Sequence, residues 1–179
     1  KYPKVSIELN CGEYIPDWQQ ETYDLMVGYS SVMPVPNHLI VRPLIKTHYI
    51  LCASPHYLVG QGCPKVPQDL HQHLWLDHPL RQHQSHLPFM VGQSILRPKP
   101  YLICNDIESL HQAALNGLGI IQTAHHAVKQ NLSKGQLRIL LEEFPMSQVD
   151  IALHYFPQSF EIKKVRLLIE HLLYFFSDY

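Results

Sequence analysis

Hydrophobic and polar positions follow two periods along this chain, and these periods predict strands that alternate with helices. Segments with period-two alternation or a short apolar run are typical of strands. They are residues 5–9, 23–27, 39–44, 48–53, 74–76, 101–104, 136–144 and 149–156. Because strands separated by helical segments usually pair in parallel, we expect a mostly parallel sheet with helical crossovers.

Helices are predicted between these strands from their end signals. Ser54 followed by Pro55 is typical of a helix start, and this helix should stop near Gly62. Thr123 is expected to cap another helix. Residues 160–176 carry apolar side chains at every third or fourth position, which predicts one amphipathic helix. The remaining expectations are brief helical turns at 16–22 and 64–71, and loop with edge strand at 77–99.

The stretch NDIESLHQAALNGLGIIQ at residues 105–122 predicts the best-defined helix of the chain. With Asn105 as its cap, Glu108 occupies the third helical position, and the two side chains can satisfy each other's backbone donors. Gly117 can adopt the left-handed conformation that ends a helix. The helix start would then lie at the carboxyl end of a strand, where parallel sheets bind ligands and spare N–H groups favour an anion.

Composition excludes several partners. The chain has 179 residues, 46% of them apolar, and a formal net charge of −1, so no strong field would draw it onto DNA or an anionic membrane. No signal peptide opens the sequence and no apolar run is long enough to cross a bilayer. The four cysteines, which form no C-x-x-C pair, are expected to be reduced thiols, and we expect a cytoplasmic protein.

Motifs of catalysis and cofactor binding are missing from the sequence. There is no G-x-S-x-G elbow, no phosphate-binding loop and no G-x-G-x-x-G, so we expect neither an enzyme nor a cofactor. Five of the 13 histidines fall close together without an H-E-x-x-H spacing, and we interpret them as surface residues of a loop rather than metal ligands. They are His71, His73, His78, His83 and His86.

The order of short motifs along the chain resembles the effector-binding domain of LysR-type transcriptional regulators. The most specific motif is LCASPHYL at residues 51–58. The others are YPKV at 2–5, YDLMVG at 23–28, RPL at 42–44, GCP at 62–64, PQDL at 67–70, ND at 105–106, GLGI at 117–120, GQL at 135–137 and KVR at 164–166. Together they span nearly the whole sequence in the order of that family.

The resemblance implies an α/β fold like that of type II periplasmic binding proteins, with two lobes joined by two crossing strands. Lobe I would be residues 1–47 plus 148–179, and lobe II residues 48–147. The first strand and helix of lobe I, and the N-terminal winged helix-turn-helix that binds DNA, do not match any part of this sequence. A small effector bound between the lobes would change how they sit, and so alter the homodimer or homotetramer that spaces the DNA-binding domains.

By the same resemblance, one set of residues would line the effector site, and no metal is implied. The set is Gly28, Tyr29, Ser30, Ser54, Asn105, Asp106, Gln122 and Thr123. Most carry neutral hydrogen-bonding groups, which favours a small polar or anionic effector. Helix capping alone is an open alternative for Ser54, Asn105 and Thr123, and Asp106 can serve only to complement a helix dipole.

Two other functions fit the same fold. A solute-binding protein of the periplasmic type would share the two lobes, but it would carry a secretion signal and stay monomeric. A small enzyme on this fold is the second alternative. A sensor would be stabilised by its ligand without turning it over, whereas an enzyme would release product.

Overall fold

The computed structural model describes residues 3, 5–12, 23–29, 36–79, 89–91, 94–96 and 98–177. The chain forms two compact units, one made of residues 1–46 and 149–179 and the other of residues 47–148. Their boundaries lie one residue from those expected for the two lobes. That the units are the lobes of a regulatory domain is a proposal.

The second unit is built on a mixed sheet in the strand order β2, β7, β3, β6, with β8 pairing the other edge of β2. The strands are β2 (Ile40–Ala53), which belongs to this unit from residue 47 onward, β3 (Trp75–Asp77), β6 (Pro100–Ile103), β7 (Ile120–Ala124) and β8 (Arg138–Leu140). Strand β3 is parallel to β6 and β7, whereas β2 is antiparallel to β7 and β8. The expectation of a mostly parallel sheet is therefore wrong, because the connection from β2 to β3 stays at one end of the sheet instead of crossing it.

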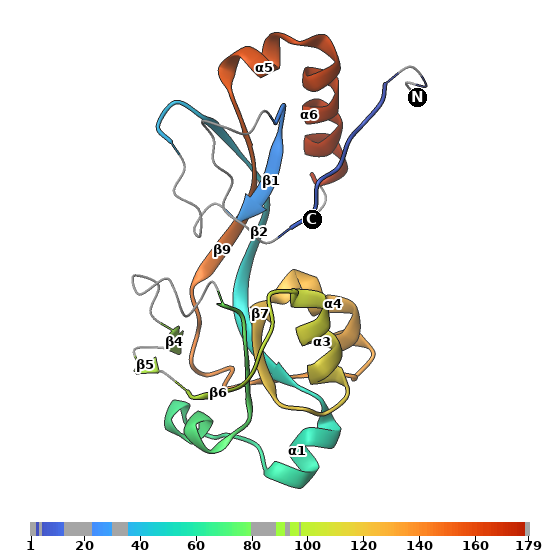
Figure 1. Cartoon of the computed structure of the whole chain (residues 1–179). Helices are drawn as coiled ribbons and strands as arrows, with labels where there is room; N and C mark the ends of the chain where they lie inside the picture. The colour runs from blue at the N-terminus through green and yellow to red at the C-terminus, as the bar shows by residue number, and fades with distance from the viewer. Residues whose placement is uncertain are drawn as a thin grey trace. The chain divides into compact units, whose positions relative to one another are not determined.

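Alternation along β7 separates two buried clusters on the two faces of this sheet. Ile121 lies in a cluster with Leu110 of α3 (Ile107–Leu115) and Val128 of α4 (His125–Ser133), and both helices pack against β7 (Figure 1). Ile120 lies in the other cluster, with Tyr57 of α1 (Pro55–Gln61) and Leu70 of the 3-10 helix η1 (Pro67–Gln72). Side chains of successive strand residues point to opposite faces of the sheet. Gln122 therefore lies on the same face as Ile120, and Thr123 on the same face as Ile121.

Local end signals predicted several helix boundaries correctly. The backbone N–H of Tyr57 donates to the Ser54 hydroxyl at 3.3 Å, and Gly62 ends α1 with φ +84°. The helix predicted near residues 64–71 is η1. At the end of α3, the N–H of Leu118 donates to the carbonyl of Ala113 at 3.0 Å, as a left-handed Gly117 requires.

Other expectations for the second unit are wrong. The strands expected at 39–44 and 48–53 form one continuous strand, β2. The strand expected at 136–144 is limited to β8, because Leu141 is left-handed at φ +54° and a turn to Phe144 follows. Within the stretch 77–99 the described strands are β4 (Phe89–Val91) and β5 (Ser94–Leu96), which form a two-stranded antiparallel hairpin.

Two helix caps also differ from the prediction. Helix α3 is capped by Asp106, one residue after the expected Asn105. Thr123 lies inside β7 and caps nothing, since α4 begins at His125 with Ala124 in the cap position. Asn105 and Thr123 are both residue types that can cap a helix. Which residue becomes the cap therefore depends on where the preceding strand ends.

The first unit pairs β1 (Met26–Tyr29) antiparallel with β9 (Gln148–Tyr155). Strand β9 is followed by α5 (Pro157–Glu161) and α6 (Lys163–Phe175), and the buried Val165 and Ile169 of α6 pack with Leu153 of β9. The single helix expected at 160–176 is interrupted, because Ile162 has the extended conformation φ −76°, ψ 112°.

Residues 5–12 of the first unit run beside α6 without forming a strand (Figure 1). The strand expected at 5–9 is therefore wrong. Val5, Ile7 and Leu9 alternate with polar residues in the sequence, but residues 5–9 are all exposed. An alternating sequence forms a strand only when its backbone finds a hydrogen-bonding partner. The helical turn expected at 16–22 lies outside the described residues.

Candidate functional site

Strands β3, β6 and β7 of the second unit are parallel, so their carboxyl ends lie at the same end of the sheet. We term this end of the sheet the carboxyl edge. It comprises Asp77 and His78 at the end of β3, Asn105 and Asp106 after β6, and residues 122–125 at the end of β7. Leu76 pairs Ile121 and Asp77 pairs Ile103. Neighbouring strands lie about 4.8 Å apart, so the whole edge is about 10 Å across, which matches a small molecule.

Asp106 accepts hydrogen bonds at the start of α3. Its carboxylate accepts from the Ser109 N–H at 2.9 Å and from the Ser109 hydroxyl. These donors, the hydroxyl first, hold the pKa of the Asp106 carboxyl below its ordinary value. Asn105 is exposed at the same edge and does not cap the helix, so capping no longer accounts for its side chain.

Thr123 belongs to a buried relay between β7 and α3. Its hydroxyl oxygen lies 2.8 Å from Nε2 of His111, and Nδ1 of the same imidazole lies 3.6 Å from a carboxylate oxygen of Glu108. The other oxygen of Glu108 accepts from the side-chain amide of Gln112 at 2.9 Å. Thr123 and His111 are buried, whereas Glu108 is exposed. His111 was not among the predicted site residues, although Glu108 and His111 are three residues apart, a spacing that places two side chains next to each other on a helix.

Gln122 faces the opposite side of the sheet from Thr123, level with the buried carboxyl of Asp77 on the next strand. An oxygen of Asp77 accepts from the N–H of His78 at 3.0 Å. Asp77 was not among the predicted site residues, although it directly follows the apolar run 74–76, just as Asn105 follows the apolar run 101–104.

His48 and His125 stack at the end of β7, with ring centroids 5.1 Å apart and planes 15° from parallel. The pairing of Tyr49 with Ala124 brings the two together. Partial burial, and then the nearby His48 and Lys129, lower the pKa of His125. This pair depends on long-range strand register, so no local signal in the sequence could have found it.

Ser54 lies at the opposite end of the sheet from the rest of the set. Cys52 pairs Ile121 in the antiparallel ladder, so Ser54 lies beyond the start of β7 while Thr123 lies near its end. Four residues of strand separate their positions, about 13 Å. Ser54 caps α1, and in this unit it does not join the carboxyl edge.

The remaining predicted site residues lie in the first unit. Gly28 and Tyr29 end β1, opposite Ala152 and Ile151 of β9, and both are half-buried. Ser30 lies outside the described residues.

The five neighbouring histidines between residues 71 and 86 were interpreted from the sequence as surface residues rather than metal ligands. The described part of the chain contains no group of three or more His, Cys, Asp or Glu side chains that could hold a metal ion. Instead, Nδ1 of His73 lies 3.1 Å from the hydroxyl of Tyr57. His83 and His86 lie outside the described residues.

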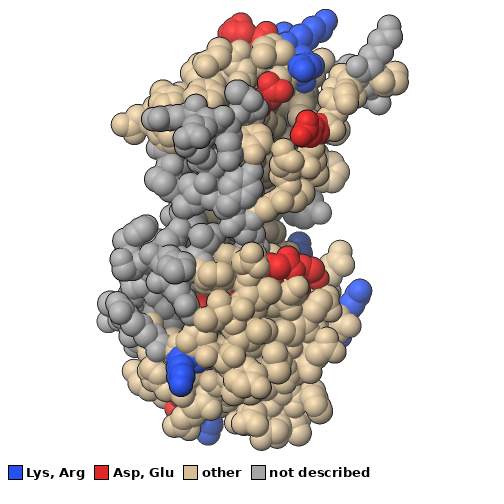
Figure 2. Space-filling view, in the orientation of Figure 1, with Lys and Arg blue, Asp and Glu red and all other residues tan. Residues whose placement is uncertain are grey.

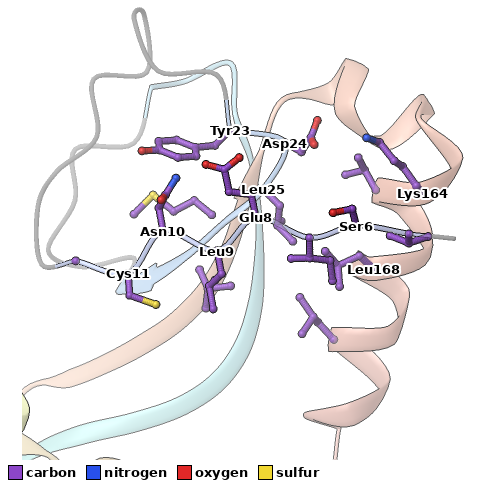
Figure 3. Close-up of a pocket in the computed structure, with 17 residues that line it drawn as sticks. Ser6, Glu8, Leu9, Asn10, Cys11, Tyr23, Asp24, Leu25, Lys164 and Leu168 are labelled. Carbon is purple, nitrogen blue, oxygen red and sulfur yellow. The ribbon is translucent and has the colours of Figure 1, made fainter. Parts of the chain in front are cut away.

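A hollow of about 1150 Å³ opens in the first unit, and it contains none of the predicted site residues. It lies between residues 5–12, the start of β1 and helix α6 (Figure 3). Ser6 lies near Leu168 of α6, and Asn10 and Cys11 lie at the far end of the segment (Figure 3). Since residues 5–12 form no strand against β1, we attribute this hollow to missing strand pairing and place the candidate site at the carboxyl edge.

Surface charge is sparse and mixed. On the face shown in Figure 2, basic and acidic side chains of the described residues are scattered, without a single-sign patch. None of the helices in the described ranges has the length and apolar character needed to cross a membrane.

Known proteins similar to this chain are transcriptional regulators. It is 30% identical over 183 residues to the uncharacterized HTH-type transcriptional regulator YhjC and 29% identical over 185 residues to the HTH-type transcriptional regulator DmlR, both of Escherichia coli K12. Each match covers 99% of this chain but only 60% and 58% of the respective relative. The chain thus spans about three fifths of the length of these relatives.

Two solved structures with the same fold are of transcriptional regulators. Full-length AphB of Vibrio cholerae superposes with a TM-score of 0.81 at 23% identity, over 98% of this chain and 59% of AphB. The regulatory domain of CrgA from Neisseria meningitidis gives 0.71 at 21% identity, over 78% of this chain and 70% of that domain. Residues 1–177 match the family described as LysR substrate binding domain. The chain belongs to this family, and its fold is that of LysR-type regulatory domains.

Proposed function

We propose that this chain is the effector-sensing part of a LysR-type transcriptional regulator and that it binds a small polar or anionic molecule at the carboxyl edge of the second unit. The contacts would come from Asn105, Gln122 and Thr123, together with Asp77 and His125. Gly28, Tyr29 and Ser30 remain further candidates. DNA would be contacted by another part of the protein, as in HTH-type relatives, and we propose a cytoplasmic location.

The observation that carries this proposal is the meeting of polar side chains where β3, β6 and β7 end. Ligands of open α/β sheets bind beyond the carboxyl ends of parallel strands. Asn105 supports it most directly, because it is exposed at this edge while Asp106 satisfies the start of α3. The similarity to transcriptional regulators supports binding without turnover.

The effector would act by shifting an equilibrium between arrangements of the chain in a homodimer or homotetramer. A ligand shifts such an equilibrium only by the difference between its affinities for the two arrangements. The oligomer should therefore respond to the same compounds that stabilise the chain. A chain that stays monomeric at every concentration in gel filtration would contradict this coupling.

The test is a thermal-shift screen of small carboxylates, sugars and aromatic acids. A compound at 100 times its Kd stabilises the folded state by about 2.7 kcal/mol, which is a clear shift. The shift should be lost in Asn105→Ala, and no product of the compound should form on prolonged incubation. Product formation would support an enzyme instead.

Asn116→Ala provides the matched control, because it makes the same change at the other end of α3. The Asn116 side chain donates to the carbonyl of Gln112 within the helix. This variant should keep the full ligand-induced shift. Equal shifts in wild type and Asn105→Ala would contradict the proposed site, and no shift with any compound class would contradict the proposed ligand chemistry.

A further inference from the structure

The relay from Glu108 through His111 to Thr123 fixes which nitrogen of the imidazole carries the proton. A neutral histidine has one N–H donor and one acceptor nitrogen. Nδ1 of His111 faces a Glu108 oxygen at 3.6 Å, and Nε2 faces the Thr123 hydroxyl at 2.8 Å. A lone pair on Nδ1 would point at a carboxylate, which is repulsive, whereas an N–H there is attracted.

The surroundings of His111 favour the same state. The Glu108 carboxylate is held in place by Gln112, whose amide donates to its other oxygen at 2.9 Å. The Asp106 carboxylate at the helix start also acts electrostatically on His111. His126 of α4 is a neighbouring titratable side chain. Burial, and then the nearby His125 and His111, lower the pKa of His126, so it carries no positive charge near pH 7.

We propose that His111 is a positioning residue whose imidazole carries its proton on Nδ1 and accepts a hydrogen bond from the Thr123 hydroxyl at Nε2. The Thr123 oxygen then has only its lone pairs to offer a ligand. The relay is buried at Thr123 and His111, so water does not compete for these hydrogen bonds. Glu108 acts through His111 and has no direct part in binding.

The consequence is a chemical class for the ligand group that meets Thr123. An oxygen that presents only lone pairs attracts a hydroxyl or ammonium donor and repels a carboxylate. An effector with a carboxylate would direct that group elsewhere along the carboxyl edge. This consequence rests on the proposed function, whereas the protonation state of His111 does not.

The test is nitrogen-15 NMR of the imidazole rings in the ligand-free chain at about pH 8, above the ordinary histidine pKa of about 6.5. The spectrum should assign His111 a pyrrole-type Nδ1 and a pyridine-type Nε2. Thr123→Val should move the Nε2 signal toward that of a nitrogen without a hydrogen-bond donor. A protonated Nε2 in the wild-type chain would overturn the proposal.

Glu108→Gln tests whether the Glu108 carboxylate controls the tautomer of His111. Glu108 is exposed, and glutamine keeps the size of the side chain. Gln112 would still donate to the remaining carbonyl oxygen, which turns the new amide N–H toward Nδ1. The proton of His111 should therefore move to Nε2. Glu142→Gln makes the same change at an exposed position after β8 and should leave the His111 signals unchanged.

An unchanged tautomer in Glu108→Gln would also overturn the proposal, since Glu108 would then not control the ring. Neither NMR result depends on an effector. A failed effector screen would therefore count against the proposed function and not against the relay.

Discussion

Gly119 packs against the carbonyl group of Leu74, and a methyl group on Gly119 would overlap that carbonyl oxygen. The same oxygen accepts from the N–H of Ile120 at 2.8 Å, so it cannot withdraw without breaking a hydrogen bond at the start of β7. Gly119→Ala should therefore destabilise the chain by about 1–3 kcal/mol through overpacking. Urea denaturation monitored by circular dichroism measures the loss.

Gly60→Ala is the control for this prediction. Gly60 lies in α1, and a Cβ built there meets no atom within 4 Å. Alanine is the better helix former by about 1 kcal/mol, so this variant should be as stable as the wild type or slightly more stable. Equal stabilities of Gly119→Ala and Gly60→Ala would contradict the close approach at Leu74.

The Thr123 hydroxyl should contribute to stability independently of any ligand. Thr123→Val keeps the shape of the side chain but removes the partner of His111 Nε2, which leaves a buried nitrogen without that hydrogen bond. The expected cost is about 1–3 kcal/mol in the free energy of unfolding. Thr123→Ser keeps the hydroxyl and should lose less, and a larger loss in the serine variant would refute the hydrogen bond.

The cap of α3 should show a dependence on pH that identifies Asp106 rather than Asn105. The Asp106 pKa is lowered in the folded chain, so its ionised form stabilises folding above the unfolded pKa of 3.8, and this stabilisation is lost as pH falls through the folded pKa. Asp106→Ala should therefore lower the unfolding midpoint at pH 7 and converge with the wild type in acid. Asn105→Ala should match the wild type at both pH values, and the reverse ranking would restore Asn105 as the cap.

Cysteine reactivity should follow burial. Burial raises the pKa of the Cys52 thiol to about 12, and thiolates are the reactive form. Cys11 and Cys63 are exposed free thiols. Iodoacetamide at pH 8 should label both in the native chain, and Cys52 only after denaturation, as read by peptide mass spectrometry. Rapid native labelling of Cys52 would show that β2 opens.

Features that depend on a few neighbouring residues could be predicted from the sequence. Ser54 with Pro55 started α1, and Gly117 ended α3, because capping and left-handed turns are local. The carboxyl edge could also be predicted in part, since Asn105 follows an apolar run. The one-residue error at Asp106 arose because both side chains are good caps.

Features that depend on distant strands could not be predicted. The pattern at residues 5–9 is that of a strand, but no strand forms without a paired backbone. Register decides that Ser54 and Thr123 lie at opposite ends of the sheet, and that His48 meets His125. Local patterns in the sequence do not reveal this pairing, so the predicted site residues include Ser54 and Thr123, which lie at opposite ends of the sheet.

The most direct test of the central claim is amide NMR mapping with each compound that raises the melting temperature in the screen. We predict that the perturbed amides cluster at the carboxyl edge, at residues 77–78, 105–106 and 122–125. Perturbations centred on the hollow at residues 5–12, or on α1 at Ser54, would contradict the claim that this chain senses its effector where β3, β6 and β7 end.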